Sequence, residues 1–323
     1  MLRKTNQYEA GGWMAEFELA AEPTHSVWNK ELEPRLEIEA GDTVHFECLD
    51  ASGGQVKPSS TVEDFLGIER DRIHALTGPV YVKGAAAGDV LEVEVLEVRH
   101  KGWGWTSTIA GLGFLDERFT EPSLFHWDLD GEVSRSLAPA VLPLRPFCGV
   151  MGVAPGEAGV FKTRPPGAFG GNMDVRDLVT ASTLYLPVFN GGALFSCGDA
   201  HAAQGDGEVC INGIECPADV TLRFALHKER ALAGPVVDAP FVAADPLGRW
   251  TVVESSPDAL GAAKTATSRM IDLLADRWGL SELHAYLLCS VAMDLRLAQV
   301  VNRPMVTVAA SIGKSILPGR RLF

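Results

Sequence analysis

VLEVEVLEV, residues Val90–Val98, alternates apolar and acidic side chains along its length. Leu91, Val93 and Val95 lie on one side, whereas the intervening glutamates mostly face water, which is the period of a half-buried β-strand. Residues 220–227 repeat this alternation of apolar and polar side chains. Both segments therefore predict strands of a sheet with one face in a hydrophobic core.

Shorter strand patterns and turn signals surround these two segments. Residues 35–40 and 43–49 alternate on either side of the turn dipeptide Gly41-Asp42, and residues 184–189 and 250–254 are short apolar runs. Glycine and proline separate nearly every pair of such runs. Many short strands with turns between them favour a mainly β protein, a sandwich or barrel rather than a parallel βαβ fold.

Helical periodicity is found only late in the chain. Residues 258–278 place apolar side chains at helical spacing, and Ser281 predicts the N-cap of a second helix that runs to about Leu297. Residues 306–310 predict a closing strand. We expect three parts packed as one compact unit: residues 1–160, residues 161–250 with the polar motifs described below, and a C-terminal α+β element, residues 251–323.

The composition excludes several classes of partner. The chain has 323 residues, 46% of them apolar, and a net charge of −14, so it would repel nucleic acid. It contains no apolar run long enough to cross a membrane, and residues 1–20 lack the apolar core of a secretory signal. Six scattered cysteines without a CxxC pair indicate reduced thiols. We therefore expect a cytoplasmic protein.

The densest polar motif is GDAHAAQGDGE, Gly198–Glu208. Asp199 and His201 are two residues apart, so in an extended chain they share a face and together can bind one cation. Carboxylate and imidazole ligands suit zinc or another first-row divalent metal. Glycines on both sides of Asp206 allow a tight turn that returns Glu208 to the same region. The alternative is a polar hairpin loop.

A second motif, GGNMDVRDL, covers residues 170–178. Asn172 and Asp174 again share an extended face. Asp174 is a candidate third metal ligand, and Asn172 is a candidate donor to a carbonyl oxygen. The alternative is an Asx turn that caps a short helix.

Two further clusters precede these motifs. DASGGQ, Asp50–Gln55, follows a predicted strand, where Asp50 is a candidate ligand and Gln55 a candidate substrate contact. The alternative is an ordinary loop. His25 lies close to Trp28 and is a candidate substrate contact, although such a pair is more often structural.

Nucleophilic centres fit the sequence less well. It contains no GxSxG elbow, no GxGxxG fingerprint and no P-loop. Cys197 lies near Asp199 and His201, but it is also the natural apolar end of a buried strand.

Taken together, these motifs resemble the acetamidase/formamidase family over nearly the whole chain. The segments that carry the resemblance are Thr24–Trp28, Asp50–Gln55, LTGPV at 76–80, GGNMDVRDL at 170–178, and LPVFNGGALFSCGDAHAAQGDGEVC at 186–210. The chain differs from the family pattern at Ala200, at Ala51-Ser52 and at Val175, and the second difference leaves the substrate open.

The resemblance implies a jelly-roll-like β-sandwich with a smaller β-barrel and a small α+β element. It also implies an enzyme that hydrolyses short-chain amides with a bound divalent metal, and a homo-oligomer, a dimer or larger. Zinc is the expected ion, with calcium or another divalent ion as the alternative. The expected site comprises Asp50, Asp174, Asp199 and His201 at the metal, Glu208, Asn172 and Asp174 in catalysis, and Gln55, His25 and Asn172 at the substrate.

Two rival functions remain compatible with the sequence. The same scaffold could hydrolyse a different amide or a urea-like substrate. Alternatively, the protein could be a non-catalytic β-sandwich that binds a metal structurally.

Overall fold

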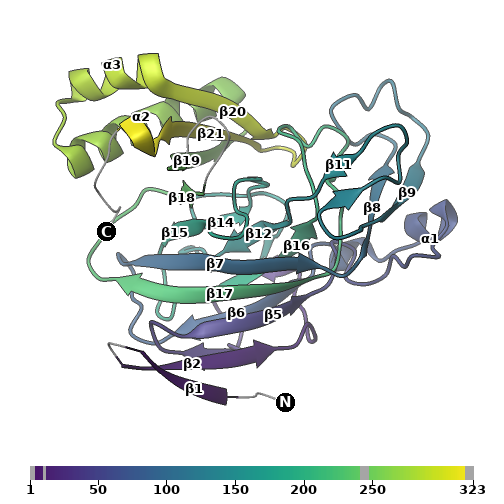
Figure 1. Cartoon of the computed structure of the whole chain (residues 1–323), viewed down its shortest axis with the longest axis horizontal. Helices are drawn as coiled ribbons and strands as arrows, with labels where there is room; N and C mark the ends of the chain where they lie inside the picture. Colours follow the sequence, from purple (N-terminus) through teal and green to yellow (C-terminus); the bar gives the residue numbers. More distant parts are fainter. Residues whose placement is uncertain (1–3, 10–11, 241–246, 317–323) are drawn as a thin grey trace.

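The computed structural model describes residues 4–9, 12–240 and 247–316, and within them two open β-sheets form a sandwich (Figure 1). The larger sheet has the order β1 (Lys4–Glu9), β2 (Gly12–Leu19), β5 (Thr43–Cys48), β17 (Ala218–His227), β7 (Val90–His100), β15 (Thr183–Pro187), β18 (Val236–Ala239), β19 (Arg249–Ser256), β21 (Val306–Gly313) and β20 (Met293–Gln299). The smaller sheet has the order β14 (Gly170–Asn172), β12 (Phe147–Gly152), β16 (Phe195–His201), β6 (Leu76–Val82) and β4 (Leu36–Ile38).

Shorter elements cover the ends of the sandwich. They are the strand pairs β3 (Val27–Trp28) with β13 (Phe161–Lys162), β8 (Trp103–Thr108) with β9 (Ser123–Asp128), and β10 (Val133–Ser134) with β11 (Leu142–Pro143), and the helix α1 (Val62–Leu66). Two longer helices, α2 (Ala259–Trp278) and α3 (Glu282–Ala292), lie at one side, with α2 packed on β19 and β21. No helix in the described ranges is long and apolar enough to span a membrane.

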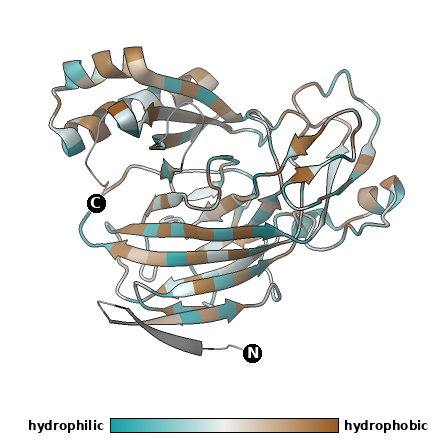
Figure 2. Ribbon diagram, viewed as in Figure 1, coloured by the Kyte–Doolittle hydropathy of each residue, from teal (hydrophilic) through white to brown (hydrophobic). Residues whose placement is uncertain are grey.

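The strand predicted from VLEVEVLEV is confirmed as β7, and Figure 2 shows the alternation of apolar and polar residues along it. Leu91, Val93 and Val95 are fully buried. The alternation breaks at Leu96, where the pairing of β7 with β17 shifts its register. A bulge at this point returns Val98 to the core side, which explains the irregular end of the pattern.

Three aromatic rings join the two sheets in the core. Phe46 on β5 and Phe224 on β17 belong to the larger sheet, whereas Phe195 on β16 belongs to the smaller one. The Phe195 ring centroid lies 5.2 Å from that of Phe224 and 6.1 Å from that of Phe46, both edge to face. Such contacts contribute about 1 kcal/mol each beyond burial. The outer face of β16 is therefore held at a fixed distance from the core.

The mainly β prediction and the late helices are confirmed, with three differences. Residues 35–40 and 43–49 form strands of different sheets rather than one hairpin, because the turn at Gly41 carries the chain from one sheet to the other. The second helix begins at its predicted cap, Ser281, but ends at Ala292, because residues 293–299 pair with β21 as a strand. The sheets described are open, so they do not form the smaller barrel that the resemblance implied.

The core and the cysteines bear on two other expectations. One hydrophobic cluster extends from Leu19 to Ala309, so strands from all three expected parts share it. The proposed boundaries at 160 and 250 stay a prediction. All six cysteines are free, five of them buried and Cys210 partly so, as expected for reduced thiols.

Candidate active site

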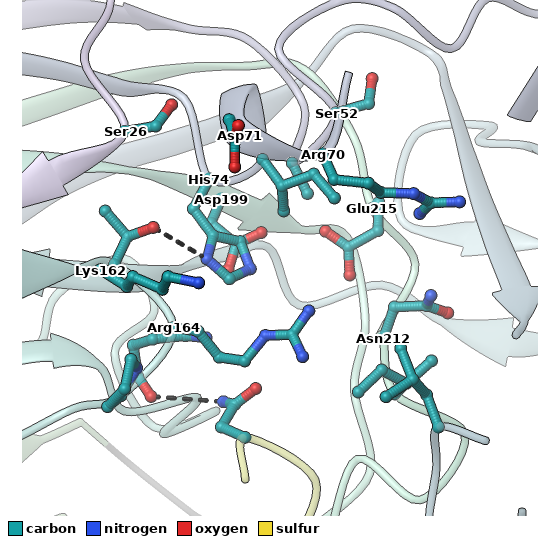
Figure 3. A pocket seen from close by; sticks show the side chains of 18 of the residues that line it. Ser26, Ser52, Arg70, Asp71, His74, Lys162, Arg164, Asp199, Asn212 and Glu215 are labelled. Atoms are coloured by element: carbon teal, nitrogen blue, oxygen red, sulfur yellow. Dashed lines mark hydrogen bonds between the residues drawn. The ribbon is translucent and has the colours of Figure 1, made fainter. Parts of the chain in front are cut away.

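A cluster of buried acidic residues surrounds one imidazole on the outer face of the smaller sheet. His201 is the last residue of β16, and the chain returns after it so that Glu215 forms a β-bridge with His201. The cluster consists of Asp174, Asp199, His201, Glu208 and Glu215, each at most 6% exposed. Figure 3 shows Asp199 and Glu215 in the cavity that these residues line.

Three carboxylates face one nitrogen of His201. Its Nε2 atom lies 3.0 Å from Glu215 Oε1, 3.7 Å from Asp199 Oδ1 and 4.0 Å from Glu208 Oε1. The sequence prediction that Asp199 and His201 lie together is therefore confirmed. The return of Glu208 to this region is confirmed as well.

Gln204 determines which atom of His201 faces the carboxylates. The Gln204 amide nitrogen donates to the carbonyl oxygens of Asp174 and Ala298, at 2.9 and 3.3 Å. Its oxygen, which can only accept, therefore lies 2.8 Å from His201 Nδ1. In the neutral imidazole, a hydrogen on Nδ1 leaves the lone pair of Nε2 directed at the acidic cluster, and this is the arrangement found around metal-binding histidines.

Asn172 lies between two carboxylates of the cluster. With its amide oriented to satisfy its neighbours, its nitrogen is 3.1 Å from both oxygens of Asp174 and 3.3 Å from Asp199 Oδ2. Its oxygen accepts from Asn302, which also donates to Asp174. The amide hydrogens of Asn172 thus hold the two aspartates in place, and none is left for a substrate oxygen.

The backbone is strained at the residues that form this site. His74, Asp174, Asp199 and Glu208 all have φ between 49° and 55°, the left-handed region that residues other than glycine rarely adopt. Such strain persists only where the surrounding structure enforces it, and it is concentrated at functional sites. At Asp199 this turn directs the side chain out of the core side of β16 and towards the cluster.

Burial shifts the pKa of most groups in the cluster. It raises the pKa of Asp174 to about 7 and that of Glu215 to about 8, and it raises the pKa of Glu208 well above its ordinary range. Burial also disfavours charge on His201, but the carboxylates of Glu215 and Asp199 outweigh this effect and raise its pKa. The groups thus compete for protons within one small volume.

The donor set suits a divalent cation. Ligand atoms of Asp174, Asp199 and His201 lie within 4.8 Å of one another, and so do those of His201, Glu208 and Glu215. The Oε2 atoms of Glu208 and Glu215 are buried and have no hydrogen-bond partner. Four carboxylates around one imidazole leave an excess of buried negative charge, which a bound cation would neutralise.

Four members of the cluster, Asp199, His201, Glu208 and Glu215, form the floor of a cavity of about 890 Å³. Apolar side chains such as Trp105, Phe65 and Ile109 form one wall, and polar residues including His74 and Arg164 form another. A cavity of this size with a few convergent polar groups is typical of a small-molecule site.

Three predicted site residues lie outside the cluster. The Asp50 carboxylate accepts from the amide and hydroxyl of Ser52, from the amide of Gly54 and from Trp105 Nε1. Gln55 bonds the backbone of Ser52 and Glu69. His25 uses one ring nitrogen on the carbonyl of Val27 and the other on Ser196. Each side chain is occupied in holding a loop.

Sequence reasoning missed Glu215, His74 and Gln204. Glu215 had a usable signal, because a glutamate between Ile214 and Cys216 is flanked by apolar residues and is therefore a candidate for burial. His74 had none, since its place in the cavity follows from an unusual backbone conformation that no spacing rule predicts.

Comparisons with known proteins show the family of this chain. The model of the acetamidase/formamidase family matches residues 14–160 and 156–318. A putative formamidase of Schizosaccharomyces pombe is 30% identical over 262 residues, covering 63% of this chain and 64% of that protein. A formamidase of Methylophilus methylotrophus is 27% identical, covering 64% of each. The chain thus spans just under two thirds of the length of these relatives.

The fold is shared with a solved structure over nearly its whole length. The crystal structure of an acetamidase from Bacillus halodurans superposes with a TM-score of 0.86 and 34% sequence identity. The match covers 93% of this chain and 98% of that one.

Gly149 provides a first test of the site. A Cβ atom added to Gly149 would lie 2.5 Å from Asp174 Oδ1 and 3.0 Å from His201 Cε1. We expect Gly149→Ala to displace Asp174 and to abolish catalysis, at a stability cost of about 1–3 kcal/mol. Gly191→Ala is the control, since nothing lies within 4 Å of its added carbon. Equal activity of both variants in an ammonia-release assay would contradict the site.

Asp50 provides a second test, which separates a loop-holding role from metal binding. Asp50→Ala leaves the buried Trp105 Nε1 and three loop donors without their acceptor, so we expect a loss of about 3 kcal/mol or more in unfolding free energy. Asp50→Asn, which keeps an acceptor oxygen, should retain bound metal by elemental analysis. If the folded Asp50→Asn protein contains less metal than the wild-type protein, Asp50 is a metal ligand after all.

Proposed function

The chain belongs to the acetamidase/formamidase family, and on this premise we propose that it hydrolyses primary amides to a carboxylate and ammonia. The single observation that carries the proposal is the buried cluster of four carboxylates around His201 at the floor of a cavity. Formamide and acetamide are the expected substrates, because relatives of this chain are named formamidase and acetamidase.

We propose further that a divalent metal ion takes part. Asp174, Asp199 and His201 would bind it, with Glu215 beside them. Mixed carboxylate and imidazole ligands favour zinc or a similar transition metal over calcium, which prefers oxygen ligands alone. When bound, such an ion supplies Lewis-acid chemistry, which polarises a carbonyl and lowers the pKa of water.

Glu208 is the residue best placed to transfer a proton from the attacking water to the departing ammonia. Glu215 Oε1 is already occupied by His201 and by the backbone amide of Gly213, at 3.0 Å each. Glu208 has its Oε2 unpartnered and its nearest contact with His201 at 4.0 Å, so its carboxylate is freer. We assign to Glu208 the removal of a proton from the attacking water and its delivery to the departing ammonia.

His74 can stabilise the oxygen of the amide. Its Nδ1 lies 3.3 Å from the Thr163 hydroxyl, which leaves Nε2 as the ring nitrogen that can donate into the cavity. A donor directed at the developing oxyanion contributes roughly 3 kcal/mol in comparable sites. This role replaces the one expected of Asn172, whose hydrogens are directed at the two aspartates.

The rival functions make different demands on the same cluster. A structural metal site is closed by its ligands, whereas this cluster opens into a cavity of about 890 Å³. The open cavity therefore favours catalysis over structural metal binding. A urea-like substrate would use the same groups. Ammonia release from a panel of amides and urea-like compounds distinguishes the two substrate classes.

His201→Ala tests the function and the metal together. Removing the imidazole deletes the central donor of the cluster, so we expect both bound metal and ammonia release from acetamide to fall to background. Elemental analysis and an ammonia assay on the purified protein measure the two quantities. The control is His100→Ala, since His100 lies on β7 outside the cavity. Full amidase activity without the imidazole would contradict the proposal.

We also propose that the chain forms a homo-oligomer, with a second copy covering α3. Leu283, Tyr286, Leu287 and Val291 form an exposed apolar stripe on α3, with Val291 81% exposed. The next element, β20, is the edge strand of the larger sheet (Figure 1), and it exposes Leu295 and Leu297. An apolar patch beside an open sheet edge is self-complementary across a two-fold axis.

The double change Leu287→Glu and Val291→Glu tests this interface. Two charges in the stripe should convert the oligomer to a monomer, as measured by light scattering after size-exclusion chromatography. Leu260→Glu, an equally exposed leucine on α2, is the matched control and should leave the mass unchanged. A wild-type chain that is monomeric at micromolar concentration would rule out the proposal.

A further inference from the structure

The cavity is lined by both acidic and basic side chains. Its floor is acidic, with Asp199, Glu208 and Glu215. Arg70, Lys162, Arg164 and Arg303 also line it, together with one further carboxylate, that of Asp71. Acetamide is only a few atoms long, whereas cavities of this volume usually accommodate much larger ligands. The cavity therefore has room for a substrate longer than acetamide.

The four cations differ in whether they already have a partner. Arg303 donates to the carboxylate of Asp116 and to the carbonyl of Gly113. Arg70 lies over the ring of Phe65 and donates to its carbonyl oxygen. These two cations hold the walls of the cavity and are not available to a ligand.

Arg164 and Lys162 are unpaired. Within the ranges that the structure describes, neither side chain makes a hydrogen bond or an ion pair, and this includes the carboxylates of the floor. Figure 3 shows both side chains extending into the cavity, with the guanidinium of Arg164 between His74 and Asn212. Arg164 is only partly exposed, so its charge is incompletely solvated and favours an anionic partner.

The pairing of β13 with β3 and a contact to His74 position the segment that carries these two cations. Lys162 is the last residue of β13 and pairs with Val27 on β3, and the side chain of Thr163 contacts His74. Burial and then the charge of Arg164 lower the pKa of Arg70. A cationic substrate tail would be repelled there, and a neutral tail would leave Arg164 unpaired.

We propose that the preferred substrates are primary amides that carry a carboxylate at their other end, bound by Arg164 with Lys162. The planar guanidinium matches a carboxylate with two parallel hydrogen bonds, and the lysine adds a second positive charge. The inference rests on the proposed function, because the amide end then lies at the acidic floor. For succinamate the reaction is succinamate plus water to succinate and ammonium, with the carbon–nitrogen bond broken and a carbon–oxygen bond formed.

The experiment compares each monoamide acid with the neutral diamide of the same length. Metal-loaded wild-type protein is assayed for ammonia release on malonamate, succinamate and glutaramate, and on malonamide, succinamide and glutaramide. We expect kcat/KM for the best monoamide acid to exceed that of its diamide by about tenfold or more, since hydrogen bonds to charged groups are worth that factor. Equal values for both members of every pair would overturn the inference.

Arg164→Gln should remove this preference selectively. We expect kcat/KM to fall about ten- to a hundredfold on the acid and less than about threefold on the diamide. Arg164→Lys should restore part of the difference. Arg72→Gln is the matched control, because it removes a nearby positive charge from a side chain that does not line the cavity. An equal loss on both substrates would contradict the role of Arg164.

Binding of the product separates failure of this inference from failure of the proposed function. Calorimetry should detect succinate binding to the wild-type protein and a loss of about tenfold or more in affinity for Arg164→Gln, with an unchanged unfolding midpoint. If no amide releases ammonia, the proposed function fails, and this binding still tests the anion site. If amides react but succinate binds both proteins equally, the anion site fails and the amidase function stands.

Discussion

The molecule is organised around the burial of several carboxylates in one place. Like charges with little solvent repel one another strongly, and each buried ion needs a partner. The structure meets this demand only in part: Asn172, Asn302 and His201 contact some of the acidic oxygens, while one oxygen each of Glu208 and Glu215 has no partner. The remaining charge is the physical reason to expect a cation, and burial raises the pKa values of Asp174 and Glu215.

Such a cluster requires a rigid support. The aromatic contacts of Phe195 fix one face of β16 against the larger sheet, and His201 extends from the opposite face at the end of the same strand. Gly149, on the neighbouring strand β12, leaves room for Asp174 where any side chain would collide with it. The left-handed backbone at Asp174 and Asp199 persists because these neighbours leave no relaxed alternative.

Sequence reasoning succeeded where local periodicity or spacing decides the structure. The alternation around Val93 identified β7, and the two-residue spacing of Asp199 and His201 brought both to one face. It failed where distant partners decide. A carboxylate followed by glycines, such as Asp50, has the same sequence pattern whether it binds a metal ion or the donors of a loop. Only the positions of Trp105 and Gly54 in the folded chain show that Asp50 accepts hydrogen bonds from the loop and its surroundings. In the same way, residues 293–299 form a strand because β21 offers them an edge.

The C-terminal part of the chain is coupled to the site although it contributes none of its acidic residues. The amide of Gly207 donates to Ala298, and the carbonyl of Gly207 accepts from Val300, so the loop that carries Glu208 pairs with the end of β20.

Gln204, which sets the orientation of His201, bonds the same segment, and Asn302 reaches Asp174. The position of Glu208 and the lone pair of His201 therefore depend on strands that come last in the chain. Because α3 packs against β20 and β21, the surface that we propose for a second copy and the loop that carries Glu208 contact the same part of the larger sheet.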